Sequence, residues 1–126
     1  MTSSVISDNF ETSTGAIPTL GGDSVETRLC RAWVNFNGTG TVAIRASYNV
    51  SSITDNGTGD YTVNFTTAMS DVNYSVSGTG SSFGGATVRA IFVSTATTPT
   101  VSAVRIQCSN YVSAEDNTYI SVQIFR

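Results

Sequence analysis

The fold is decided by residues 31–45, which read RAWVNFNGTGTVAIR. Ala32, Val34 and Phe36 alternate with the side chains between them, and this period of two is typical of a strand with one buried face. The alternation stops at residues 37–40, NGTG, and resumes immediately afterwards. Asn-Gly between two alternating segments is a strong signal for a hairpin, so two antiparallel strands joined by a tight turn are predicted.

The same period recurs as far as the C-terminus. Further short strands are expected at residues 50–54, 61–66, 72–76, 88–93, 101–108 and 118–125. Turns or loops are expected at residues 55–60, 97–99 and 109–117, and a long flexible stretch at residues 77–85. Residues 88–93, VRAIFV, are more continuously apolar than the other segments and are expected to be buried on both faces. About eight short strands without a helical pattern between them indicate an all-β fold, a single antiparallel β-sandwich of jelly-roll-like form.

Composition supports this fold class. The chain has 126 residues, the size of one domain. Val and Ile dominate its apolar residues, and β-branched side chains favour strands. Residues 1–28 are polar and lack sustained alternation, so we expect an extended N-terminal arm before a β-sandwich domain at residues 29–126. The arm either serves attachment and interchain packing or is a frayed terminus.

Several classes of function are disfavoured by the residue types alone. The chain has six Arg, no Lys and no His against nine acidic residues, for a net charge of −3. Without His there is no imidazole relay or imidazole metal ligand, and without Lys there is no Schiff base or P-loop lysine. Scattered Arg in an acidic chain do not make a nucleic-acid surface. We therefore expect a protein that is not an enzyme, with no cofactor and no nucleic-acid partner.

The N-terminal sequence lacks the features of a targeting segment. It has no basic region followed by an apolar stretch, so no signal peptide is expected, and no apolar run approaches the length of a membrane span. A Thr- and Ser-rich exterior composition without a secretion signal fits either a fragment of something larger or a protein released by lysis, as a virus particle is.

Two stretches carry a resemblance to a known family. Residues 31–45 and residues 49–65, NVSSITDNGTGDYTVNF, resemble a domain at the ends of tail-fibre and related virion proteins of tailed bacteriophages, notably those of cyanobacteria and other aquatic bacteria. The similarity is close over about residues 31–76. It implies a non-enzymatic structural or adhesive module located in the virion, made in the host cytoplasm, usually homotrimeric, and linked to other virion proteins through the N-terminal arm.

One acidic loop is a candidate metal site. Asp55 and Asp60 flank residues 56–59, NGTG. A glycine-rich acidic loop can hold Ca²⁺ through carboxylate and carbonyl oxygens. The interpretation we favour is a turn in which Asn-Gly supplies a positive φ and the aspartates make local hydrogen bonds.

Two other segments are candidates for contact with a receptor. Glu115 and Asp116 lie between Tyr111 and Tyr119, and acids beside aromatic rings on an exposed loop are a common arrangement for binding sugars. The same residues would also make an ordinary connection between strands. Phe83, surrounded by glycines and serines, is the second candidate.

Candidate interface residues are Trp33 and Arg45. Trp33 is out of phase with its apolar neighbours, which indicates packing in the core or at a subunit interface rather than ligand contact. Arg45 is expected to point away from the face that carries Val42. Cys30 and Cys108 could pair, but a protein assembled in a reducing cytosol favours two buried thiols.

These observations favour a tail fibre or short appendage tip that attaches to host-surface polysaccharide or protein through exposed loops. One alternative is a purely architectural virion component, such as a capsid decoration, head fibre or baseplate protein. A second is a carbohydrate-binding module, and an enzyme acting on polysaccharide is the least favoured.

Overall fold

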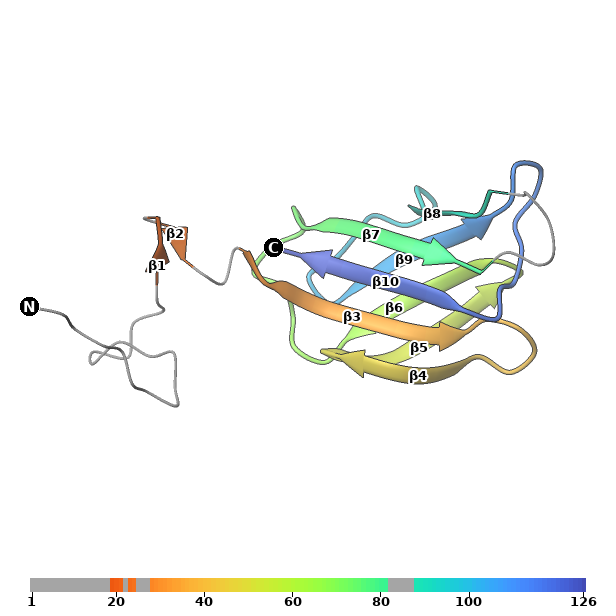
Figure 1. The fold of residues 1–126 in the computed structure, drawn as a ribbon, viewed down its shortest axis with the longest axis horizontal. Coiled ribbons are helices and arrows are strands. Elements are labelled where there is room, and N and C mark those ends of the chain that lie inside the picture. Colours follow the sequence, from red (N-terminus) through yellow and green to blue (C-terminus); the bar gives the residue numbers. More distant parts are fainter. Residues whose placement is uncertain (1–18, 22, 25–27, 82–87) are drawn as a thin grey trace, which may run out of the picture.

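The structure, a computed structural model, describes residues 19–21, 23–24, 28–81 and 88–126 (Figure 1). Its strands are β1 (Thr19–Leu20), β2 (Asp23–Ser24), β3 (Cys30–Asn37), β4 (Ala43–Tyr48), β5 (Val50–Gly57), β6 (Asp60–Phe65), β7 (Ser75–Gly80), β8 (Ala90–Val93), β9 (Ala103–Ser109) and β10 (Ile120–Phe125). The described residues contain no α-helix. The prediction of an all-β sandwich of about eight short strands is confirmed.

Two four-stranded antiparallel sheets form the sandwich. Their strand orders are β4-β3-β10-β7 and β5-β6-β9-β8, and Figure 1 shows one sheet in front of the other. The pairs β3–β4, β5–β6 and β8–β9 are neighbours in the chain and in one sheet, whereas the remaining connections cross between the sheets. Both β3 and β10 therefore lie in the middle of one sheet, as β6 and β9 do in the other.

The core lies between the inner faces of these central strands. Burial alternates residue by residue along β3, β6, β9 and β10, as the pleat requires. Ala32, Val34 and Phe36 point inward as predicted. The rings of Phe36 and Tyr61 meet edge to face across the two sheets, with centroids 5.2 Å apart.

Two predictions about individual segments are wrong. Residues 88–93 are not buried on both faces, since Val88 and Phe92 are exposed. The reason is that β8 is an edge strand with β9 as its one partner in the sheet. Of the predicted flexible stretch 77–85, residues 77–80 are not a loop but part of β7, paired with β10, and residues 82–85 lie outside the described residues. A Cβ on Gly78 would lie 2.8 Å from Cγ2 of Ile91, so this glycine serves close packing rather than flexibility.

The two ends of the sandwich carry different connections. At the left in Figure 1, the proximal end, β3 begins and β10 ends. At the right, the distal end, lie the connections β3–β4, β5–β6 and β9–β10. Before the sandwich, β1 and β2 pair with Thr19 opposite Ser24. Residues 1–18, 22 and 25–27 of the predicted arm lie outside the described residues, so the arm remains a prediction.

Candidate functional site

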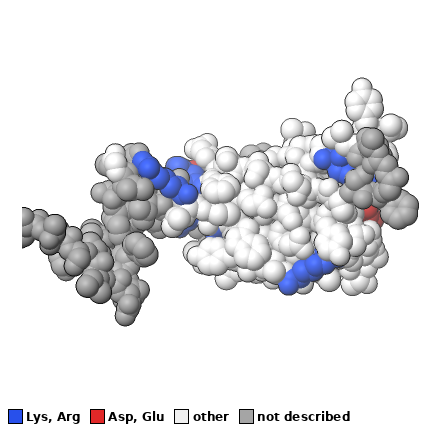
Figure 2. Space-filling model, in the orientation of Figure 1, with Lys and Arg blue, Asp and Glu red and all other residues white. Residues whose placement is uncertain are grey.

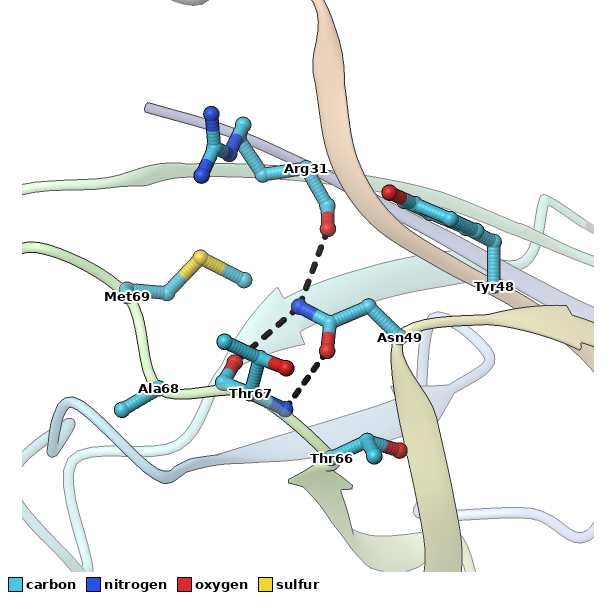
Figure 3. A pocket seen from close by; sticks show the side chains of 7 residues that line it. All are labelled: Arg31, Tyr48, Asn49, Thr66, Thr67, Ala68 and Met69. Carbon is cyan, nitrogen blue, oxygen red and sulfur yellow. Dashed lines mark hydrogen bonds between the residues drawn. The ribbon is translucent and has the colours of Figure 1, made fainter.

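The proximal end has a pocket of about 330 Å³, the corner pocket, at the passage from β4 to β5 (Figure 3). Asn49 lies in it with a φ of 54°, a left-handed conformation that asparagine tolerates better than most residues. Its amide Nδ2 donates to the carbonyl oxygens of Arg31 and Thr67, and its Oδ1 accepts from the Thr67 amide at 2.6 Å. These bonds engage the Asn49 side chain in holding the corner together.

The distal end has a pocket of about 400 Å³, the distal pocket. Its lining includes Thr39, Arg89, Glu115, Asp116, Thr118 and Tyr119. Three of the four residues that the sequence singled out around the β9–β10 connection, Glu115, Asp116 and Tyr119, are thus brought together, and a volume of this size suits a small ligand.

Asp116 ties the loops of the distal end to one another. Its Oδ1 accepts from the backbone N–H of Gly59 at 2.8 Å and from the hydroxyl of Tyr61 at 2.6 Å. The same hydroxyl lies 3.0 Å from the carbonyl oxygen of Gly38. Burial, followed by the hydrogen bond to Asp116, raises the pKa of Tyr61, so the phenol keeps the proton that it donates. The Tyr61 hydroxyl therefore joins the β3–β4 and β9–β10 connections, and Asp116 adds the β5–β6 connection through Gly59.

Arg89 is the residue of the distal pocket that sequence reasoning missed. Its Nη2 lies 2.8 Å from Oε2 of Glu115, and its side chain is 10% exposed. Glu115 also accepts from the side-chain amide of Asn110 through Oε1. Within the described residues, neither Nε nor Nη1 of Arg89 has a hydrogen-bond partner, although both are buried. The feature of the sequence that could have indicated a role for Arg89 is its place as a lone arginine in the apolar stretch 88–93.

Tyr111 stands on a tightly bonded turn beside the distal pocket. Oδ1 of Asn110 accepts from the backbone N–H groups of Val112 and Ser113, each at 2.7 Å, and a β-bridge between Ser109 and Ala114 closes the turn. Tyr111 is 95% exposed and Val112 is 88% exposed. The turn therefore presents two large apolar side chains to solvent.

The two aspartates of the predicted acidic loop have different partners. Oδ1 of Asp55 accepts from the backbone N–H of Gly57 at 2.9 Å, a local hydrogen bond as expected. The predicted turn over residues 55–60 is shorter than expected, because β5 continues to Gly57 and β6 begins at Asp60. Asp60 instead accepts two bonds of 2.7 Å from Nε and Nη2 of Arg105 on the neighbouring strand β9. In the described part of the chain, no group of three His, Cys, Asp or Glu side chains could hold a metal ion.

The ion pair of Asp60 gives a prediction about pH. Hydrogen bonding to Arg105 is the largest cause that holds the pKa of Asp60 below its ordinary value of 3.8. A lowered folded-state pKa stabilises the protein above the unfolded-state pKa, and this stabilisation is lost as pH falls through the folded-state pKa. We expect Asp60→Asn to lower the free energy of unfolding at pH 6, and the difference from the wild type to shrink towards about pH 2. Urea unfolding followed by circular dichroism at a series of pH values measures this.

Asp71→Asn is the matched control. Asp71 pairs with Arg126 on the surface, where solvent weakens ion pairs, so its substitution should have a smaller effect at every pH. A difference between wild type and Asp60→Asn that stays constant from pH 6 to about pH 2 would contradict the assignment.

Trp33 and Arg45 lie on the outer face of the β4-β3-β10-β7 sheet. Trp33, 38% exposed, is opposite Tyr48, 60% exposed, in the β3–β4 register. The guanidinium carbon of Arg45 lies 4.2 Å from the centroid of the Tyr119 ring, a cation–π contact. Figure 2 views the molecule from this side and shows a surface that is mostly free of charged side chains over the described strands. The prediction that Arg45 points away from the face of Val42 agrees with this contact.

The remaining candidates from the sequence are Phe83 and the two cysteines. Phe83 lies outside the described residues. Cys30 and Cys108 are free cysteines, as expected, on β3 and β9 of different sheets. Cys108 is buried and its sulfur accepts from Nδ2 of Asn117 at 2.7 Å, whereas Cys30 is only partly buried.

Comparison of the chain with protein-family models, with curated proteins and with solved structures finds no match. No helix among the described residues is long and apolar enough to cross a membrane. The site is therefore interpreted from its own geometry and from the sequence resemblance.

Proposed function

We propose that this chain is a non-enzymatic structural protein of a phage virion, a tail fibre or short appendage tip, which attaches to the host surface through its distal end. The observation that carries the proposal is the turn that presents Tyr111 and Val112 next to the distal pocket. The resemblance of residues 31–65 to phage tail-fibre domains supplies the biological setting.

The arrangement of the strands suits attachment. β3 begins and β10 ends at the proximal end, so an N-terminal arm bound to other virion proteins would leave the distal end facing outward (Figure 1). The hydrogen bonds of Asn110 hold the turn in place before a partner binds. Less conformational freedom is then lost on binding, which favours affinity.

The outer face of the β4-β3-β10-β7 sheet suits contact between copies. Trp33 and Tyr48 are exposed side by side there, and an apolar aromatic pair on a surface with few charges is typical of an interface. We assign this face to a homotrimer. Three linked distal ends would multiply weak contacts, since linked sites raise avidity by roughly 10²–10⁴.

Adsorption to host cells tests the proposal. We expect labelled protein to bind the cells, to compete with phage for them, and to have the mass of three copies in solution. Tyr111→Ser and Val112→Ser should each weaken adsorption by about tenfold, because each removes apolar contact area from the exposed turn. Val72→Ser is the control, because Val72 is an exposed valine between β6 and β7, at the proximal end.

The other outcomes distinguish the alternatives. Protein that neither adsorbs nor competes with phage would favour a purely architectural component of the virion. A single copy in solution that still adsorbs would favour a carbohydrate-binding module and would remove the homotrimer from the proposal.

A further inference from the structure

The distal pocket holds a buried cation with unused donors. Arg89 is nine-tenths buried, and of its guanidinium nitrogens Nη2 alone is in the ion pair with Glu115. Nε and Nη1 are buried and have no hydrogen-bond partner among the residues described. The free-energy cost of removing these two donor atoms from water is therefore not offset by a hydrogen bond. Both atoms have less than 1 Å² of exposed surface, so a ligand oxygen in the pocket would offset this cost once the Arg89 side chain turns toward the ligand.

The charge of the pocket indicates what kind of ligand group it would bind. Arg89 contributes one positive charge, while Glu115 and Asp116 contribute two negative charges, so the lining is negative overall. A carboxylate or phosphate on the ligand would be repelled by both acids in a partly buried site. A free cation would have to compete with the partners that both carboxylates already have, Arg89 and Asn110 for Glu115, and Gly59 and Tyr61 for Asp116. An uncharged group that both donates and accepts hydrogen bonds meets all three side chains.

The other lining residues favour a polyhydroxylated ring. Thr118 adds a hydroxyl group that can donate and accept, and Thr39 adds one that can accept, since its proton is donated to Oδ1 of Asn37. Tyr119 is 57% exposed, and its contact with Arg45 holds the ring in a fixed position at the edge of the pocket. An aromatic ring held in this way gives a flat apolar surface beside the hydroxyl and carboxylate groups.

We propose that the distal pocket binds one uncharged sugar ring of a host-surface glycan. The ring packs on Tyr119, its hydroxyl groups donate to Glu115 and Asp116, and its oxygens accept from Nε and Nη1 of Arg89. This inference rests on the proposed function and assigns its ligand: Arg89 and Tyr119 contact the sugar, and Arg45 is a positioning residue that acts through Tyr119.

Titration with monosaccharides tests the assignment. The probes are the methyl glycosides of glucose, galactose and mannose, with glucuronate as the charged counterpart, and the readout is the NMR spectrum of isotope-labelled full-length protein. At least one neutral glycoside should shift the resonances of Thr118 and Tyr119 in a saturable way, and glucuronate should bind about tenfold more weakly or not at all. Tighter binding of glucuronate, or no saturable shift with any neutral glycoside, would overturn the proposal.

Variants separate the pocket from the rest of the surface. Tyr119→Ala and Arg89→Lys should each weaken binding by about tenfold, the second because lysine keeps the charge but lacks the fork of donors. Val72→Ala is the control, an exposed valine at the proximal end between β6 and β7, and should change the affinity less than twofold. Thermal unfolding checks each fold, and Thr118→Val provides a milder second test within the pocket.

Failure of this inference is distinguishable from failure of the proposed function. Protein that adsorbs to host cells equally well with and without Tyr119→Ala would overturn the sugar site and leave attachment standing. Saturable binding of a neutral glycoside by protein that adsorbs to no host cell would support the site and overturn attachment.

Discussion

Gly59→Ala is expected to lower the free energy of unfolding by about 3 kcal/mol or more. Gly59 has a φ of 64°, where a side chain is strained. A Cβ there would lie 2.6 Å from the backbone nitrogen of Glu115 and closer still to the carbonyl oxygen of Cys108. These neighbours are backbone atoms, so no rotamer change relieves the overlap. The β5–β6 turn and the β9–β10 connection would have to separate.

Gly40→Ala isolates the steric part of this effect. Gly40 has a φ of 63°, almost the same as Gly59, but a Cβ there meets nothing within 4 Å among the described residues. The backbone strain alone should lower stability by about 1 kcal/mol. Urea unfolding of both variants gives the difference. Equal losses would show that the β9–β10 connection yields easily, and that the distal end is less rigid than its hydrogen bonds indicate.

The consequence for binding follows from the same contacts. The backbone N–H of Gly59 donates to Asp116, and its carbonyl oxygen accepts from the backbone N–H of Cys108 at 2.7 Å. Glu115 and Asp116 of the distal pocket are therefore placed by the β5–β6 turn, which belongs to the same sheet as β9. A variant that pushes this turn away should lose sugar binding along with stability, whereas Gly40→Ala should keep it.

The fold was predictable because the decisive pattern is local. Alternation at Ala32, Val34 and Phe36 depends only on the pleat of one strand, and the structure places all three in the core. The stretch 88–93 has an equally apolar composition but lies in an edge strand. Position in a sheet is set by long-range pairing, which composition does not encode.

The candidate site was predictable only in part, because its contacts also depend on long-range pairing. The acidic residues beside aromatic residues at positions 111–119 indicated a segment that does line the distal pocket. The partners that give Asp116 its role are Gly59 and Tyr61, which are more than 50 residues away in the sequence, in the β5–β6 turn and in β6. Arg89 reaches Glu115 for a similar reason, because β8 and β9 are neighbours in one sheet. Such contacts depend on the arrangement of the strands in the sheets, which local sequence patterns do not show.

Tyr61→Phe is expected to lower the free energy of unfolding by about 2 kcal/mol, because a hydrogen bond to a charged group contributes more than one between neutral groups. The change removes one oxygen from a buried side chain and leaves the ring contact with Phe36 intact. It also leaves Asp116 with one fewer donor and removes the hydroxyl beside the Gly38 carbonyl. Urea unfolding measures the loss.

Tyr74→Phe is the matched control for this change. The hydroxyl of Tyr74 lies 2.9 Å and 3.1 Å from the neutral carbonyl oxygens of Thr100 and Ala103 and shares its one proton between them, so its removal should lower stability by only about 1 kcal/mol. A double-mutant cycle of Tyr61→Phe with Asp116→Asn should give a coupling energy above about 0.5 kcal/mol. Additive losses would mean that Tyr61 stabilises the core alone. If the Tyr61 hydroxyl positions Asp116 in the distal pocket, the cycle should show coupling. Tyr61→Phe should then also weaken sugar binding, and Tyr74→Phe should not.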